Sequence, residues 1–429
     1  MNHPLQTLLN TRTPDHPIGI PSLCSANEWV IDAGMLWAQK HQIPLLLEAT
    51  ANQVNQFGGY TGMTPQDFFD FVEQRALKNK FPLSSLFLGG DHLGPMVWKN
   101  ETEESAMNKA ETLVRDFIMA GFTKIHLDAS MPLADDEITQ GLDPSVVARR
   151  AARLAAACEQ AYRSLHVKNS DAVPPIYVVG SEVPIAGGAH DKEDTISVTT
   201  PKNFHEEVTL FQDAFEEHGL HEAWKRVIAV VVQPGVEFGN DTIMDYDAEA
   251  ASALCHALDD YPGLVFEGHS TDYQRPEALH TMISNGVAIL KVGPALTFAL
   301  REGLYALQSM EKILFSDSPE KQSHYCEVLE RVMRENPNYW KTYFDGPERM
   351  LSINRIFGLS DRSRYYLGNP EVKAAEEKLL HNLSQTDIPL GLLHQFLPDQ
   401  YRKVRQNTLS TQPSALLLDK ICALLDDYR

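Results

Sequence analysis

The stretch from Leu86 to Pro95 places a carboxylate and an imidazole side by side after an apolar run. It reads Leu-Phe-Leu-Gly-Gly-Asp-His-Leu-Gly-Pro, so Asp91 and His92 follow two glycines. Neighbouring strand residues point to opposite faces, so both side chains can share one site only where the strand is ending. An imidazole can bind a divalent metal, while a carboxylate can move a proton or fix the imidazole tautomer. The alternative is structural, with Asp91 capping the following helix.

Eight short apolar runs alternate with longer stretches of helical periodicity. Continuously apolar runs are typical of a parallel sheet covered by helices, and eight β-then-α units close a TIM (β/α)8 barrel. A doubly wound open sheet is the alternative fold, but no run is followed by a dinucleotide-type glycine fingerprint. The runs span residues 18–24, 43–47, 86–95, 123–127, 176–181, 227–232, 264–268 and 287–290. At the carboxyl ends of a barrel the following residues would converge: Glu48, Asp91, His92, Asp128, Glu182, Gln233, His269 and Lys291.

Histidines and carboxylates at strand ends suit one divalent ion, such as zinc or manganese, with open positions for substrate oxygens. His92, Glu182 and His269 come from three separate runs, and we predict them as the metal ligands. Asp128 is the reserve ligand. We predict a structural role and no metal binding for His126, because it lies two residues deeper in its strand than Asp128. A hydrogen-bonded polar ring without a metal is the alternative.

A metal that polarises a ketose carbonyl or hydroxyl needs a neighbouring group to remove or return a proton. Asp91, Asp128 and Glu48 are the predicted groups for this transfer. Lys291 directly follows four apolar residues and could bind an anionic oxygen or serve as a Schiff-base amine.

Substrate contacts are expected from loops that follow the runs. The loop from Ala49 to Pro65 is rich in amides and glycines, and a glycine at 293 would let backbone N–H groups face a phosphate where a helix begins. The loops 129–143 and 183–200 are candidate lids, with Gly187 and Gly188 as hinges. The predicted substrate-binding residues are Gln53, Asn55, Gln233, Ser270, Thr271 and Gly293.

The composition argues against several classes of partner. The net charge is -21, which repels nucleic acid and anionic lipid. No apolar run approaches the roughly 20 residues of a membrane span, and the polar, proline-broken start lacks the core of a signal peptide. Five widely spaced cysteines without a CxxC pair favour reduced thiols. We therefore expect a cytoplasmic protein without nucleic-acid or membrane partners.

The chain of 429 residues is longer than the roughly 250 residues of a typical barrel. We predict a TIM-type barrel over 1–310 and a C-terminal helical extension over 311–429 that packs on it. The extension contains a basic and aromatic stretch, Ser360 to Tyr366, and an amphipathic helix over Pro413 to Leu425. We expect it to be structural or subunit-binding rather than catalytic.

Several long motifs resemble, in the same order, the Z-subunit (GatZ/KbaZ) family of bacterial class II D-tagatose-1,6-bisphosphate aldolase. The likeness extends over nearly the whole chain. The motifs are Glu48–Pro65, Gly89–Pro95, His126–Ser130, Val231–Phe238, His269–Gln274, Leu290–Glu302, Ser360–Tyr366 and Asp387–Leu390.

The resemblance implies a TIM-barrel subunit in galactitol or N-acetylgalactosamine catabolism, through tagatose 6-phosphate. In that family the Z subunit keeps a catalytic Y-type class II aldolase subunit folded and fully active and is not itself the aldolase. The expected partners are therefore that subunit and a sugar or sugar-phosphate ligand, within an oligomer. The pair Asp91 and His92 also resembles the pair of class II aldolases in which the acid shuttles a proton and the imidazole binds zinc. This chain departs from them by having fewer strand-end histidines.

The resemblance also supplies an alternative function. Some relatives are labelled ketose 4-epimerases, so the chain could be a metal-dependent ketohexose or ketohexose-phosphate 4-epimerase that interconverts tagatose and fructose. An older label of tagatose-6-phosphate kinase finds no support, because the sequence contains no P-loop.

Overall fold

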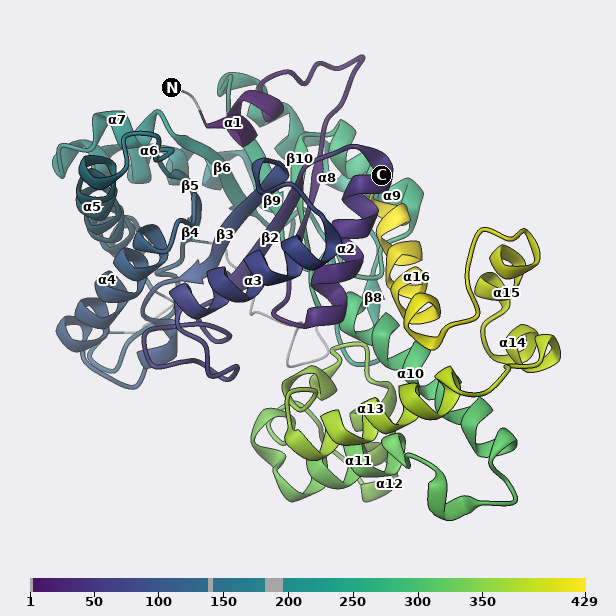
Figure 1. Cartoon of the computed structure of the whole chain (residues 1–429). Helices are drawn as coiled ribbons and strands as arrows, with labels where there is room; N and C mark the ends of the chain where they lie inside the picture. Colours follow the sequence, from purple (N-terminus) through teal and green to yellow (C-terminus); the bar gives the residue numbers. More distant parts are fainter. Residues whose placement is uncertain (1–2, 138–141, 182–195) are drawn as a thin grey trace.

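A closed barrel of eight parallel strands forms the centre of the computed structural model, which describes residues 3–137, 142–181 and 196–429 (Figure 1). Each apolar run supplies one strand, so the predicted TIM barrel is confirmed. The barrel closes where β1 pairs with β10, with Ser22 opposite Lys291. The strands are β1 (Ile20–Cys24), β2 (Leu45–Thr50), β3 (Leu86–Leu93), β4 (Lys124–Leu127), β5 (Ile176–Val179), β6 (Val227–Val232), β9 (Val265–Gly268) and β10 (Val287–Val292), while β7 (Glu237–Phe238) and β8 (Ile243–Met244) form a separate antiparallel pair.

Helices surround the barrel and begin at recognisable caps. In α3, for example, Thr64 and Asp67 form a reciprocal capping box with Pro65 at the first helical position. The surrounding helices are α2 (Glu28–His41), α3 (Pro65–Asn79), α4 (Glu103–Met119), α5 (Pro144–Lys168), α6 (Pro201–Glu217), α7 (His221–Trp224), α8 (Ala248–Ala257), α9 (Pro276–Ser284) and α10 (Pro294–Leu314). Short 3-10 turns are η1 (Leu83–Ser85), η2 (Pro95–Trp98), η3 (Leu258–Asp260), η4 (Pro319–Lys321), η5 (Pro337–Tyr339), η6 (Arg362–Tyr365) and η7 (Asp426–Tyr428).

The amino end of the barrel interior is apolar and is covered by α1 (Pro4–Leu9), which lies beyond the first residues of the strands (Figure 1). Leu5 and Leu9 of this helix are buried in one cluster with the strands. The N-cap is His3, whose Nδ1 accepts the Leu5 N–H at 3.1 Å. The strand members of the cluster are Ile20, Leu46, Phe87, Ile176, Val178, Ile228, Ala229, Val231, Val265, Ala288 and Ile289.

Strand β3 contains a bulge. Asp91 and His92 share a site because of this bulge, and not because the strand ends at them, as the sequence predicted. The apolar run does not stop at its two glycines, because the strand continues to Leu93. Gly90 pairs with Ile125, but Leu93 pairs with Leu127, so β3 carries one extra residue there. His92 has a left-handed φ of 48°. This local kink lets both side chains reach the carboxyl end of the barrel.

A second group of helices follows α10, and one of them returns to the barrel. This helix, α16, is the predicted amphipathic helix, and it packs against α2 and α10. Helix α10 runs through residue 310, and the division of the chain at that position stays a prediction. The helices are α11 (Tyr325–Glu335), α12 (Glu348–Phe357), α13 (Pro370–Ser384), α14 (Leu390–Phe396), α15 (Pro398–Arg405) and α16 (Pro413–Leu425).

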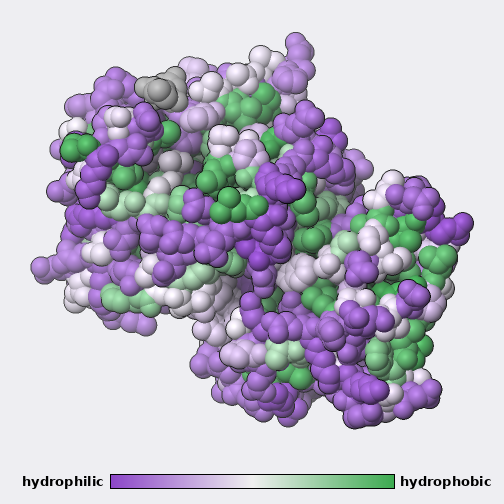
Figure 2. Space-filling view, in the orientation of Figure 1, coloured by the Kyte–Doolittle hydropathy of each residue, from purple (hydrophilic) through white to green (hydrophobic). Residues whose placement is uncertain are grey.

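Hydrophilic residues cover most of the visible face of the molecule, with smaller hydrophobic patches between them (Figure 2). Among the helices that the structure describes, none has both the length and the apolar composition needed to cross a membrane.

Candidate functional site

Two buried lysines and three carboxylates form an ionic network inside the carboxyl half of the barrel. Lys124 Nζ lies 2.6 Å from both Glu48 Oε1 and Glu267 Oε2, and all three side chains are fully buried. Lys291 Nζ lies 2.8 Å from Glu48 Oε2 and 2.8 Å from Asp91 Oδ1. Gly89 makes room for this network, because a Cβ there would lie 2.8 Å from the Glu48 side chain.

Asp91 lies at the mouth end of this network and does not cap a helix. Besides Lys291, its carboxylate contacts His126 Nδ1 at 3.0 Å and accepts a weak hydrogen bond from Cys24 Sγ at 3.5 Å. Burial alone would raise the pKa of Asp91, but the neighbouring His92 and Lys291 outweigh it and hold that pKa well below its ordinary value. Asp91 is therefore an ionised carboxylate at the end of a network in which lysines and carboxylates alternate.

Three imidazoles meet beside Asp91. The ring centroids of His92, His126 and His269 lie 5.0 to 5.2 Å apart. His92 Nδ1 lies 2.8 Å from Asp128 Oδ2. Burial opposes the charged form of His92, yet Asp91 and Asp128 raise its pKa above the ordinary value. Burial lowers the pKa of His269 to about 4, so this ring is neutral near pH 7 and suited to metal binding.

Four donors lie close enough together to hold one metal ion. One ligand atom from each of Asp91, His126, Glu267 and His269 lies within 4.8 Å of the other three. His126 Nε2 is buried and has no hydrogen-bond partner among the described residues, which leaves a ring nitrogen that a ligand could satisfy. The four buried carboxylates Glu48, Asp91, Asp128 and Glu267 outnumber the cationic groups here, which are Lys124, Lys291 and the His92 ring with its raised pKa. Nitrogen and carboxylate donors with excess negative charge fit a divalent cation such as zinc or manganese.

The predicted metal ligands meet this group only in part. His269 belongs to it, and His92 lies against it with its Nδ1 directed to Asp128. Glu182 lies outside the described residues, as do the predicted hinge glycines of the second lid. The prediction from the sequence did not include Glu267 among the ligands and gave His126 only a structural role, whereas both belong to this group.

Strand periodicity could have identified both residues. Lys124 and His126 alternate in β4 and Asp128 directly follows it, while Glu267 lies in β9 and His269 directly follows its end. Side chains two residues apart share the inner face of a barrel strand. The deeper position of His126 in its strand was therefore no reason to exclude it from the site.

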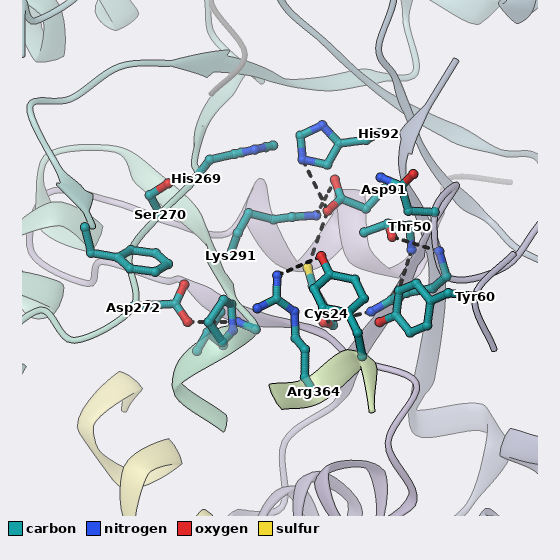
Figure 3. Close-up of a pocket in the computed structure, with 17 residues that line it drawn as sticks. Cys24, Thr50, Tyr60, Asp91, His92, His269, Ser270, Asp272, Lys291 and Arg364 are labelled. Carbon is teal, nitrogen blue, oxygen red and sulfur yellow. Dashed lines mark hydrogen bonds and ion pairs between the residues drawn. The ribbon is translucent and has the colours of Figure 1, made fainter. Parts of the chain in front are cut away.

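A cavity opens beside the four possible metal donors, and two of them, Asp91 and His269, line it (Figure 3). Asp91, His92, His269 and Lys291 line its deep side. Its outer side is lined by the loop after β2, the loop after β9 and the start of α10, and also by Arg364 and Tyr365, which come from η6 far along the chain.

Three of the six predicted substrate-binding residues line this cavity. They are Gln53, Ser270 and Gly293, the last of which stands at the start of α10. The Gly293 N–H does not face the cavity, however, because it donates to Asp272 Oδ1 at 3.0 Å, as does the N–H of Ala295 at 2.8 Å. The predicted phosphate position at this helix start is thus occupied by a carboxylate of the chain itself.

The other three predicted residues have structural contacts. The Thr271 hydroxyl is fully buried and donates to the Lys291 carbonyl at 2.7 Å. Asn55 organises its own loop, since its Oδ1 accepts the N–H groups of Phe57 and Gly59. Gln233 Oε1 likewise accepts two N–H groups of the turn that follows it.

Comparisons with known proteins agree over nearly the whole chain. A sequence model of the family described as D-tagatose-1,6-bisphosphate aldolase subunit GatZ/KbaZ-like matches residues 5–429. Proteins named D-tagatose-1,6-bisphosphate aldolase subunit GatZ from Salmonella paratyphi B and Salmonella paratyphi A are each 45% identical over 412 residues, which is 96% of this chain and 95% of theirs. A crystal structure from Sinorhizobium meliloti 1021, described as a probable tagatose 6 phosphate kinase, is 44% identical with a TM-score of 0.87 and covers 96% of this chain and 99% of its own.

Proposed function

The chain belongs to the GatZ/KbaZ-like family of D-tagatose-1,6-bisphosphate aldolase subunits, and from this premise we propose that it is the non-catalytic subunit of such an aldolase. In this role it keeps a Y-type class II catalytic subunit folded and fully active, in the breakdown of galactitol or N-acetylgalactosamine through tagatose 6-phosphate. The observation that carries the proposal is the 45% identity to GatZ subunits over 96% of the chain. The oligomer would contain both kinds of subunit.

The cavity in this subunit is proposed to bind a divalent metal and a sugar or sugar phosphate. Asp91, His126, Glu267 and His269 would hold zinc or manganese, and Asp128 would orient His92 beside them. When bound, the metal would act as a Lewis acid toward a hydroxyl or carbonyl oxygen. Lys291 keeps Asp91 ionised and in place.

A second candidate function is a metal-dependent ketohexose or ketohexose-phosphate 4-epimerase. The position of Asp91 favours it, because this ionised carboxylate lines an open cavity beside the proposed metal donors, where a ligand's hydroxyl could contact it. Glu48 lies behind Lys291 and sets its position, so it would act through the lysine and without contact to the ligand. A purely supporting subunit has no physical need for this arrangement.

Co-expression tests the subunit role directly. The Y-type subunit is expressed with and without this chain, and soluble yield and aldolase rate per catalytic subunit are measured. We expect both to rise several-fold with the chain present. Unchanged yield and rate would refute the subunit role.

The purified chain alone tests the epimerase. It is assayed for interconversion of tagatose and fructose, and of their phosphates, with added zinc, added manganese or a chelator. The variant D91N removes a proposed base that is also a proposed metal ligand, so its zinc affinity is measured beside its turnover, and the exposed D317N is the matched control. Metal-dependent turnover that D91N alone abolishes would establish the epimerase, whereas absence of turnover in all metals would refute it.

A further inference from the structure

The C-terminal extension contributes a cation to the barrel cavity. Arg364 and Tyr365 of η6 line the same cavity as Asp91 and His269, although the extension was expected to be structural or subunit-binding (Figure 3). Both residues also line an adjoining, larger cavity between the extension and the barrel. The aromatic ring of Tyr60, in the loop after β2, packs on Tyr365 with centroids 4.7 Å apart. This contact fixes the extension against the rim of the site.

Arg364 is held in position without being neutralised. Its Nη1 donates to the carbonyl oxygens of Ser360 and Asp361, and its Nη2 donates to the Tyr365 hydroxyl at 3.0 Å. Within the described part of the chain, no carboxylate lies within 4.0 Å of this guanidinium, and its Nε forms no hydrogen bond. One edge of a preorganised fork is therefore left for a ligand.

Arg362 adds a second unpaired charge behind the same ring. The guanidinium carbons of Arg362 and Arg364 lie 4.6 and 4.5 Å from the centroid of Tyr365. Arg362 is buried, and no ion pair joins it to a carboxylate of residues 3–137, 142–181 or 196–429. The burial of a guanidinium group without a counter-ion costs desolvation free energy, and a bound anion would offset that cost.

The other deeply buried arginines of the chain show the contrast. Arg150 pairs with Asp136 and Glu103, Arg301 pairs with Asp361, and Arg355 pairs with Glu330 and Glu348. Each of these has a structural counter-ion, as burial normally requires. The two arginines of η6 lack such counter-ions among the described residues, and Arg364 also lines the cavity.

We propose that Arg364 binds the phosphate of a phosphorylated sugar whose hydroxyl or carbonyl oxygens lie toward Asp91, His126 and His269. The inference rests on the proposed ligand cavity and names its anion-binding residue. The two ends of the cavity differ in charge, since the carboxylates that line and lie behind the deep end outnumber the lysines there, whereas the outer wall carries a guanidinium without an ion-pair partner among the described residues. A ligand with an anionic ester at one end and neutral oxygens at the other matches that polarity.

Asp272 is a second carboxylate, besides Asp91, that lines this cavity. Its Oδ1 accepts the N–H groups of Gly293 and Ala295, which hold it at the start of α10 and beyond ion-pair distance of Arg364. The phosphate is thus assigned to the Arg364 side of the cavity. The helix start, where the sequence placed it, is already capped.

Calorimetric titration of the full-length protein tests the proposal. The probes are fructose 6-phosphate, fructose and inorganic phosphate, and the variants are R364Q, R364K and the exposed R349Q on α12. We expect R364Q to weaken fructose 6-phosphate binding about tenfold or more, because a charge-assisted bidentate pair is lost. R364K should retain part of the affinity, and R349Q should match the wild type. The affinity for fructose should not change in any variant.

Several outcomes would overturn the inference. Equal binding of fructose 6-phosphate by R364Q and the wild type would remove the assignment of Arg364 while leaving the ligand cavity intact. Binding of neither sugar by the wild type would refute the cavity as well. Tight inorganic phosphate binding with no gain for the sugar phosphate would identify a free-phosphate site and overturn the sugar-phosphate assignment.

A measurement on the wild type covers the case in which R364Q fails to fold. Phenylglyoxal modification of Arg364 and Arg349 is followed by peptide mass spectrometry with and without fructose 6-phosphate. Protection of Arg364 alone supports the proposal, and equal modification of Arg364 in both samples contradicts it.

Discussion

The two ends of the barrel interior differ completely in chemistry although the same strands build both. At the amino end, α1 and the first strand residues form an apolar cluster whose polar cap is His3. At the carboxyl end, the same strands carry lysines, carboxylates and imidazoles. On β9 the change takes two residues, from Val265 in the apolar cluster to Glu267 in the ionic network.

The difference shows how this barrel separates stability from binding. Burial of the apolar end contributes roughly 25 cal/mol for each Å² of apolar surface removed from water. The ionic end gains much less, because the desolvation of charges offsets most of their attraction. The packed end of the barrel therefore keeps a network such as Lys124 with Glu48 and Glu267 in place, and this network in turn positions Lys291 at the cavity.

The largest expected effect comes from breaking the charge balance of the ionic end. K124M would leave Glu48 and Glu267 facing each other in a buried site, with Lys291 as their remaining cation. We expect a loss of about 3–5 kcal/mol in the free energy of unfolding, as for other buried pairs that lose one partner. Urea unfolding at pH 7, followed by circular dichroism, measures it.

A surface lysine provides the control for this variant. Lys225 pairs with Glu222 at 2.6 Å, but both side chains are largely exposed. K225M should cost less than about 1 kcal/mol. If K124M and K225M cost the same, the ionic end would not be a buried, balanced network.

The next effect concerns which imidazoles bind the metal. We expect H126Q and H269Q to weaken zinc binding by about a hundredfold, and H92Q by about tenfold because it would act from outside the ligand set. H3Q, at the apolar end, should leave the affinity unchanged. Competition with a chromophoric chelator measures all four. A larger loss for H92Q than for H126Q would restore the ligand set expected from the sequence.

The architecture was predictable because the strands of a parallel barrel are continuously apolar and evenly interrupted. All eight runs became barrel strands, and Asp91, Lys291 and His269 reached one cavity because barrel geometry brings strand ends together. The family was likewise recognisable from long motifs in the same order. These features depend on local pattern and chain order, both of which the sequence contains.

His126 and Glu267 were missed although strand periodicity marks them, whereas three other failures depend on contacts between segments or strands. No local pattern revealed that Arg364 of the extension reaches the barrel mouth, since this requires η6 to pack against the loop after β2. The bulge that directs His92 arises from an unequal pairing of β3 and β4. Asp272 took the helix start predicted for phosphate, and only three-dimensional proximity placed its carboxylate there.

The smallest expected effect is a change in the free energy of unfolding with pH, which arises from His3 at the apolar end. Burial lowers the pKa of His3 from 6.5 to about 4, so the unfolded chain binds a proton more readily than the folded one. His3 therefore stabilises the fold fully above pH 6.5, and this contribution is lost as the pH falls toward 4. Between pH 7 and pH 5 we expect a loss of about 2 kcal/mol from this group.

The variant H3N isolates that contribution. Asparagine retains an N-cap acceptor for the Leu5 N–H but does not titrate in this range. His92 and His269 titrate in both proteins, so the difference between wild type and H3N reports His3 alone. Urea midpoints measured at pH 7 and pH 5 should fall further for the wild type than for H3N. Parallel changes would mean that α1 opens to admit the proton, and that the apolar end is not the closed, stabilising half of the barrel.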